Sequence, residues 1–364
     1  MTNKIYFPDL YVERNKLMID KLNMLRISET KFTRNNKINI NKLQLKEEKL
    51  WDFLDGMQLK GRSGRAITFK KQITPQISKL LGFIITDGSL ISTEPRISLG
   101  QNDEGLLLKY LDIINEGYIT SLNFNFDGKE TKVLSSPLRY ILHKYYKIPL
   151  GKKVKIVETP PQILTSDNSD ILRHFIAGLF DGDGYLQYYY LKNKPILDHV
   201  AFCVSTSSHQ LVKQAADILK RLGIGCSLSK KNDGRLTLQT AGFSNTLKFY
   251  EQIIPLIFHK ERKEISNKII LGEDFIGKFT IPLTQDLKDL FKEIRNRKLD
   301  KELIDIEIKY KYIKSLRSIE SWTYPSKGGK VRSIYVYEAC NLLNKNHKDY
   351  IPLSQLNLIE RALK

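Results

Sequence analysis

The chain has 364 residues, of which 41% are hydrophobic and 27% charged, a composition that excludes a disordered protein. Its length predicts two or three domains, and no apolar run reaches the roughly 18 residues that a membrane span needs. The 59 basic residues against 40 acidic ones leave a net charge of +19, which favours a polyanionic partner such as nucleic acid. The alternative is a basic surface that serves only solubility.

The charge is concentrated at the two ends of the chain. Residues 1–75 carry a net +8, and their pattern predicts helices within 13–26 and 42–56. The basic stretch 60–71 contains glycine and arginine, so it is either a loop that contacts phosphates or a solvated linker. We therefore predict a mainly helical, basic N-terminal extension over residues 1–75.

The centre of the chain contains an internal repeat. Residues 78–90 resemble residues 174–186, and the Asp-Gly pairs that close them place Asp87 and Asp183 at an offset of 96. Later matches occur at an offset of 106, which fits an insertion near residues 188–198. These later matches are Asp127-Gly128 with Asp233-Gly234, and Ile148–Leu150 with Ile254–Leu256.

Each copy is predicted to fold in the order αββαββα. The strand pair is clearest in the second copy, where residues 185–190 and 200–206 alternate and are rich in aromatics. Amphipathic helices follow at 104–115 and 209–223, and the second Asp-Gly of each copy predicts a hairpin turn. The predicted boundaries are a first module over 76–154, a linker over 155–170 and a second module over 171–270.

The first helix of each copy is apolar on nearly all faces, so it should be buried. Small residues four apart should let the two helices pack closely side by side. Glycines directly after the helices suit a left-handed residue that ends a helix. The small residues are Gly82 with Thr86 and Gly178 with Gly182, and the terminal glycines are Gly88 and Gly184.

Close packing of these helices would bring Asp87 and Asp183 together at one end of the interface. Each carboxylate would lie at the negative end of a helix dipole, which favours cations. Carboxylates with nearby carbonyls, here those of Gly88 and Gly184, are hard oxygen ligands suited to Mg²⁺. The alternative is that both aspartates only cap or turn the chain. Symmetry demands no carboxylate at Asp181, whose counterpart is Ile85.

The sequence IAGLFDGDG (176–184) resembles the motif of the LAGLIDADG, or DOD-type, homing endonucleases, and LLGFIITDG (80–88) resembles a divergent first copy. The resemblance implies an α+β fold of two pseudo-twofold subdomains whose saddle-shaped antiparallel sheets lie in the DNA major groove. It implies a site-specific double-strand DNA endonuclease with a long recognition site. By motif position, Asp87 and Asp183 would be the catalytic acids that bind Mg²⁺ or Mn²⁺.

The resemblance also suggests supporting residues. A polar residue after the second strand often supports catalysis in the family, and Gln101 has that place in the first copy, with Thr206 as its rough counterpart. Basic residues near the metal are usual, and Lys230 or Lys231 could serve. The alternative for both lysines is a surface position on a hairpin that faces DNA.

Residues 276–364 carry a net +7 and are predicted to form an accessory, DNA-binding domain. Residues 283–316 have the pattern of a charged helix, and residues 321–345 predict a hairpin followed by a helix. A helix-turn-helix or winged helix would fit this segment, although no sharp motif identifies either.

A duplicated module should supply two active sites in one chain, so we expect a monomer. The start lacks the apolar core of a signal peptide, and the three cysteines lack metal-ligand spacing. We therefore expect that the protein is not secreted. Its expected location is the cytoplasm of a prokaryote, in association with the nucleoid, or else an organelle. The ends, Met1 and RALK, favour a free-standing or intron-encoded enzyme over a complete intein. A non-cleaving transcription regulator and an RNA-splicing maturase are the alternatives.

Overall fold

The structure is a computed structural model, and the chain forms two compact units in it. One unit comprises residues 1–185, 202–240 and 251–260, and the other comprises residues 186–201, 241–250 and 261–364. The structure describes residues 10–13, 15–25, 33–34, 37–40, 43, 45–61, 65–122, 124–127, 130–190, 197–272, 275, 280–282, 284–299 and 330–362.

The N-terminal part contains the two predicted helices, α1 (Lys16–Met24) and α2 (Glu47–Leu54). It also contains a five-stranded sheet in the order β2-β3-β1-β4-β5, which the sequence pattern did not predict. Each strand is only two or three residues long, too short for alternation to be recognised. The strands are β1 (Tyr11–Glu13), β2 (Thr33–Arg34), β3 (Lys37–Asn39), β4 (Gln58–Lys60) and β5 (Ile67–Thr68).

An aromatic cluster joins this N-terminal part to the first module. Trp51 of α2 lies 4.9 Å from Tyr145 and 6.0 Å from Tyr140, measured between ring centroids, and Phe69 lies 5.0 Å from Tyr145. Such aromatic pairs stabilise beyond the area that they bury. The N-terminal residues are therefore packed into the same unit as the first module.

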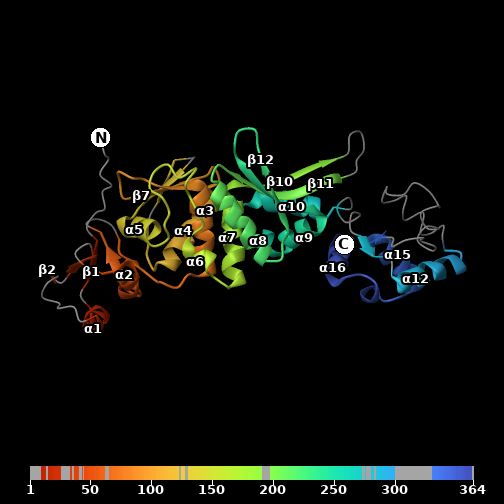
Figure 1. Ribbon diagram of the computed structural model, residues 1–364, viewed down its shortest axis with the longest axis horizontal. Helices are drawn as coiled ribbons and strands as arrows, with labels where there is room; N and C mark the ends of the chain where they lie inside the picture. Colours follow the sequence, from red (N-terminus) through yellow and green to blue (C-terminus); the bar gives the residue numbers. More distant parts are fainter. Residues whose placement is uncertain are drawn as a thin grey trace. The chain divides into compact units, whose positions relative to one another are not determined.

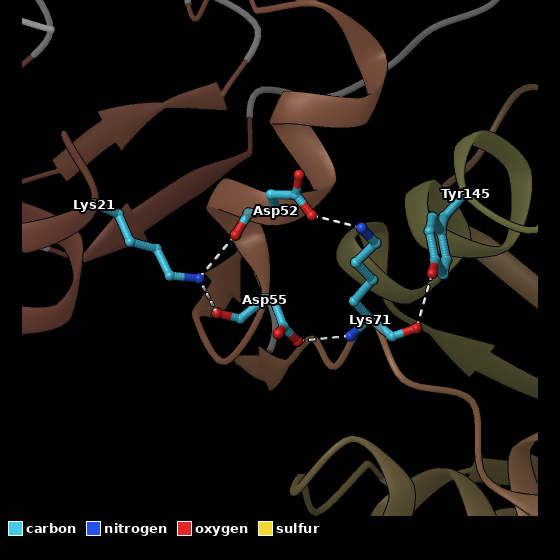
Figure 2. A network of polar contacts seen from close by, with 5 residues as sticks. All are labelled: Lys21, Asp52, Asp55, Lys71 and Tyr145. Atoms are coloured by element: carbon cyan, nitrogen blue, oxygen red, sulfur yellow. Dashed lines mark hydrogen bonds and ion pairs between the residues drawn. The ribbon is translucent and has the colours of Figure 1, made fainter. Parts of the chain in front are cut away.

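A polar network reinforces the same contact (Figure 2). The ammonium group of Lys21 donates to the backbone carbonyls of Asp52 and Asp55 at the end of α2. The side chain of Asp52 accepts a hydrogen bond from the ammonium group of Lys71. The side chain of Asp55 accepts one from the backbone N–H of Lys71. The hydroxyl of Tyr145, in the first module, donates a hydrogen bond to the backbone carbonyl of Lys71 at 2.8 Å. The middle of the basic stretch 60–71, residues 62–64, lies outside the described residues.

The first module has the predicted αββαββα order. Its sheet runs β6-β7-β9-β8, all antiparallel, with Gly88 opposite Leu99 in the first pair. The hairpin glycine Gly128 lies outside the described residues. The elements are α3 (Pro75–Asp87), β6 (Gly88–Leu90), β7 (Arg96–Gly100), α4 (Glu104–Gly117), β8 (Phe124–Phe126), β9 (Glu130–Leu134) and α5 (Ser136–Lys144).

The second module repeats this order, and its sheet runs β10-β11-β13-β12 in the same arrangement. Its first two strands are longer than those of the first module, as the predicted insertion requires. A short helix, α6 (Pro161–Leu164), lies in the predicted linker. The elements are α7 (Ser169–Asp183), β10 (Gly184–Tyr190), β11 (Leu197–Thr206), α8 (His209–Arg221), β12 (Cys226–Lys230), β13 (Leu236–Thr240) and α9 (Gly242–Gln252).

Helices α3 and α7 pack side by side, as predicted (Figure 1). A Cβ atom added at Gly82 would lie 2.8 Å from the backbone nitrogen of Leu179. One added at Gly178 would lie 2.9 Å from the backbone carbon of Lys79, and one at Gly182 would collide with Thr86. At Gly82 and Gly178 the obstacles are backbone atoms, which cannot withdraw as a flexible side chain can, so glycine is required at these two positions.

The prediction of left-handed glycines after the two helices was wrong. Gly88 has a φ of −96° and Gly184 a φ of −78°, both in the extended region, so the chain leaves each helix directly into a strand. Space requires glycine here instead, because a Cβ on Gly88 would lie 2.8 Å from the backbone of Ile84. The corresponding atom on Gly184 would lie 2.5 Å from the Phe180 carbonyl oxygen.

The Asp181 carboxylate is fully buried and serves the fold. It accepts hydrogen bonds from the Tyr110 hydroxyl at 2.7 Å, from the Phe258 N–H at 2.8 Å and from the His259 N–H at 2.9 Å. The equally buried ammonium group of Lys79 lies 3.6 Å away and donates to the Leu256 carbonyl. Buried charges require such partners, so this pair fixes the segment after α9 against both central helices.

The second unit includes the C-terminal helices. Strand β15 (Lys330–Arg332) pairs with β14 (Thr280–Pro282), about fifty residues earlier, and α15 (Ser333–Leu343) follows it directly. The helix predicted over 283–316 is present as α12 (Gln285–Asn296), and residues 300–329 lie outside the described residues. The other helices are α10 (Lys260–Ile270) and α16 (Leu353–Ala362). Within the described part of the chain, no helix has the length and apolar composition for crossing a membrane.

Candidate active site

The C-terminal ends of α3 and α7 bring Asp87 and Asp183 together. Each is the last residue of its helix and is half-buried. A Cβ atom on Gly182 would lie 3.3 Å from the carboxyl carbon of Asp87, so the backbone just before Asp183 lies against that carboxyl group. Both carboxylates therefore lie at helix ends whose dipoles favour cations.

Gln101 lies beside the first of these carboxylates. Strand β7 returns antiparallel to β6 and ends at Gly100, which places the next residue next to the end of α3. The side-chain amide of Gln101 donates to Oδ2 of Asp87 at 2.5 Å. The rough counterpart in the second module, Thr206, uses its hydroxyl differently, as the acceptor for the backbone N–H of Ser208 at 3.4 Å.

Lys153 is a site residue that the sequence pattern did not single out. It lies in the run Lys152–Ile156, in which its neighbours are exposed while its own side chain is buried. Its ammonium group donates to the Ile84 carbonyl in the last turn of α3. Burial lowers the pKa of Lys153 to about 7, against the opposing effect of Asp87 and Asp183. The only sequence signal is its position just after the repeated Ile-Pro-Leu.

We predict that Lys153→Met leaves the fold intact and raises its melting temperature by about 2–5 °C at pH 7, because the buried charge costs more than its contacts return. A folded-state pKa below that of the unfolded chain means that the unfolded state binds more protons between pH 7 and 10. The difference in Tm should therefore shrink as the pH rises to 10. Thermal melts of both proteins at pH 7 and pH 10 check this, and a lower Tm for the variant at pH 7 would contradict it.

The two lysines named from the resemblance lie on the β12–β13 hairpin. Lys230 is exposed, whereas Lys231 is half-buried and donates to the Tyr185 hydroxyl at 3.2 Å. Nearby Arg235 forms an ion pair with Asp233 at 2.6 Å. This contact is the main cause that raises the pKa of the Arg235 guanidinium, and Tyr185 and Asp183 raise it by smaller amounts. The hairpin thus directs Lys231 and Arg235 toward the second module's end of the site.

The donor set suits a hard divalent cation that keeps part of its water shell. Two carboxylates at paired helix ends supply oxygen ligands, and among the described residues no group of three His, Cys, Asp or Glu side chains forms a metal cluster. Mg²⁺ is commonly bound by one or two carboxylates plus water and substrate phosphates. Asp87 and Asp183 would therefore hold the ion, and the remaining positions would be filled by water and by the bound phosphodiester.

The chain thus has an α+β fold of two repeated modules, with one carboxylate at the end of each central helix. Residues 170–254 match the family model described as a LAGLIDADG-like domain. The second module, which contains the motif with Asp183, is therefore similar to the domains of this family.

Two curated relatives share part of the chain. A stretch of 183 residues is 25% identical to a subunit of the A-type ATP synthase of Pyrococcus abyssi, covering 48% of this chain and 16% of that protein. A stretch of 144 residues is 30% identical to the ATP-dependent DNA helicase Hel308 of Methanocaldococcus jannaschii, covering 33% of this chain and 11% of the helicase. Because the chain spans less than a fifth of either relative, the activities in their names do not transfer to it.

Several solved structures resemble the chain at low similarity. The homing endonuclease I-DmoI in complex with DNA and Mn is 18% identical, with a TM-score of 0.36, covering 49% of this chain and 96% of that one. The homing endonuclease I-WcaI bound to its DNA recognition sequence is 14% identical, with a TM-score of 0.37, covering 54% and 87%. Similarity at this level does not show what this chain binds or cuts.

Proposed function

We propose that this protein is a site-specific, divalent-metal-dependent endonuclease that cuts both strands of a DNA duplex. The observation that carries the proposal is the meeting of Asp87 and Asp183 at the paired ends of α3 and α7, beside a buried lysine. A pair of pseudo-symmetric carboxylates suits a pair of phosphodiesters on antiparallel strands. The family of the second module and the net charge of +19 support the same substrate.

Each residue has a role that follows from its position. Asp87 and Asp183 would hold Mg²⁺ or Mn²⁺, which would supply Lewis acidity at the scissile phosphate. Gln101 orients the carboxylate of Asp87 by its hydrogen bond. Lys153 has a pKa of about 7, so it could give or take a proton near neutral pH, and its positive charge would act on both carboxylates. Lys231 and Arg235 add positive charge for the phosphate backbone.

The pairing of α3 with α7 within one chain supplies both half-sites, so we propose that the enzyme acts as a monomer. The insertion of two sheets into the major groove would give the long recognition site.

Selection from a randomised duplex library tests the proposal. The purified protein is incubated with the library and Mg²⁺, cut molecules are captured by their new ends and sequenced, and EDTA replaces Mg²⁺ in the control. A single long consensus with breaks in both strands is the expected result. Retention of a duplex consensus without breaks would indicate a non-cleaving binder, and preference for an RNA library would indicate a maturase.

We propose that residues 276–364 contribute to phosphate binding through exposed lysines. Replacing Lys292 and Lys348 by glutamine should weaken duplex binding and flatten the slope of log K against log salt, by about 0.9 for each phosphate that is no longer neutralised. The matched control replaces Lys213 and Lys220, which are exposed on α8, the helix that packs against β12 and β13. Fluorescence anisotropy across a salt series measures both. Equal slopes for the two double variants would contradict the prediction.

A further inference from the structure

The packed faces of α3 and α7 share the same close-contact positions but differ in charge. A Cβ atom added at Gly82 would enter the carbonyl group of Phe175, and one added at Gly178 would enter that of Lys79. The two contacts are equivalent, because their residues correspond at an offset of 96. Since the glycines recur in both helices, shape alone would allow α3 to pack on a second copy of α3, and α7 on a second copy of α7.

One side of this interface contains buried charges. The carboxylate of Asp181 on α7 receives two groups from the first module, the hydroxyl of Tyr110 at 2.7 Å and the ammonium group of Lys79 at 3.6 Å. All three side chains are buried. The other donors to this carboxylate, the backbone N–H groups of Phe258 and His259, belong to its own module. The first module thus supplies a cation and a hydroxyl to a carboxylate of the second.

The equivalent side of the interface is apolar. The positions that correspond to Lys79 and Asp181 in the other copy are occupied by Phe175 and Ile85, which are both buried. Counted from the capping residues of α4 and α8, the position of the tyrosine is occupied by the buried Ala215. The repeat therefore keeps the glycines of the interface and replaces each of these polar side chains by an apolar one.

Pairing of two like modules would separate the buried charges. In a pair of first modules, Lys79 of each copy would face Ile85 of the other. In a pair of second modules, Asp181 would face Phe175 and would keep only the backbone donors of its own module. A buried charge that loses its partner strongly destabilises the structure, and each like pair would contain this defect twice. The first module is also synthesised first, so its α3 face can meet other copies before α7 exists.

We propose that the buried pair of Lys79 and Asp181, together with Tyr110, is a pairing determinant that makes the first module pair with the second and excludes pairs of like modules. The surface is the α3 face, and the partner that it fits is a helix with a carboxylate at the position of Asp181. This inference concerns the assembly of the chain and does not rest on the proposed endonuclease function. Two different sheets held together in this way present an asymmetric surface, whereas two like modules would present a twofold-symmetric one.

Cutting the connection between the modules of the full chain tests the proposal. A protease site is inserted after the exposed Asp167, and the purified protein is cut, unfolded in urea and refolded by dilution, so that the pieces select their partners anew. Native mass spectrometry then identifies the pieces in each complex. The wild type should form unlike pairs, with like pairs below about 1%, because each missing partner lowers the pairing constant at least about a hundredfold.

The decisive variant combines Lys79→Met with Asp181→Asn, which removes both charges and keeps the approximate shape of both side chains. Its like pairs should exceed about 10%, since neither piece then buries an unpaired charge. Unlike pairs should remain the majority, because the backbone N–H of Thr159 in the first piece still donates to the side chain of Gln214 in the second.

The matched control combines Lys213→Met with Asp217→Asn, the same changes at two exposed residues one turn apart on α8, and should pair as the wild type does. If Lys79→Met prevents refolding, Lys79→Gln with Asp181→Asn is the second neutral variant, because it keeps a side-chain donor at this position. Equal fractions of like pairs in the wild type and the neutral variant, whether low or high, would overturn the inference. That result would leave the proposed cleavage centre unaffected.

Discussion

Asp87→Asn or Asp183→Asn should abolish double-strand cleavage, lowering its rate by at least about a thousandfold, while duplex binding stays within a few-fold. Each substitution keeps the size of the side chain and removes the negative charge that would hold a divalent cation at a helix end. Cleavage of a supercoiled plasmid that contains the selected target measures the change, with binding followed by anisotropy in the presence of Ca²⁺.

Asp181→Asn is the contrasting substitution, because it removes a different carboxylate, two residues before Asp183. Asp181 is buried and paired with Lys79, so its loss should lower the Tm, an effect that neither of the other two substitutions should share. Nicking of one strand by a single active-site variant agrees with the account. Full double-strand cutting by Asp87→Asn or Asp183→Asn would refute the assignment of these carboxylates.

Gly178→Leu should destabilise the protein more than any surface substitution, by about 3 kcal/mol or more, or prevent folding altogether. A side chain at this position would enter the backbone of α3, where a Cβ atom would already lie 2.9 Å from the carbonyl carbon of Lys79 and 3.0 Å from the nitrogen of Phe83. Gly178→Ala should give a smaller loss in the same direction. Denaturant unfolding followed by circular dichroism measures both.

Gly105→Ala is the matched control, because Gly105 is an exposed glycine in the first turn of α4 and its nearest obstacle is the side chain of Asp103. Alanine there should be neutral or slightly stabilising, since it favours the helix. If Gly178→Ala behaved like Gly105→Ala, the two central helices would not approach as closely as the structure has them.

Much of the central architecture could be predicted from the repeat. Matched glycines and Asp-Gly pairs predicted the αββαββα order and the packing of α3 on α7. They also predicted that Asp87 and Asp183 lie at the ends of these helices. The resemblance was confirmed for the second module, which matches the model of a LAGLIDADG-like domain. The prediction of a positive φ at Gly88 and Gly184 was wrong. Crowding at the end of each helix requires glycine at these positions, although the backbone there is extended.

The remainder depends on contacts between distant residues. The N-terminal sheet is built from strands too short to have a pattern, and Trp51 attaches it to a helix about ninety residues later. No sequence pattern distinguishes Lys153 from its neighbours, and only the fold shows that it is buried at the end of α3. Asp181 likewise gains its partner Lys79 from the other module.

In the proposed function, the carboxylates at the ends of α3 and α7 form one metal-dependent cleavage centre. Anomalous diffraction from crystals of the protein with its target duplex and Mn²⁺ tests this most directly. We expect anomalous peaks about 2 Å from carboxylate oxygens of both Asp87 and Asp183, beside the scissile phosphates. A duplex bound across this face with Mn²⁺ held elsewhere, and with no peak at either aspartate, would contradict it.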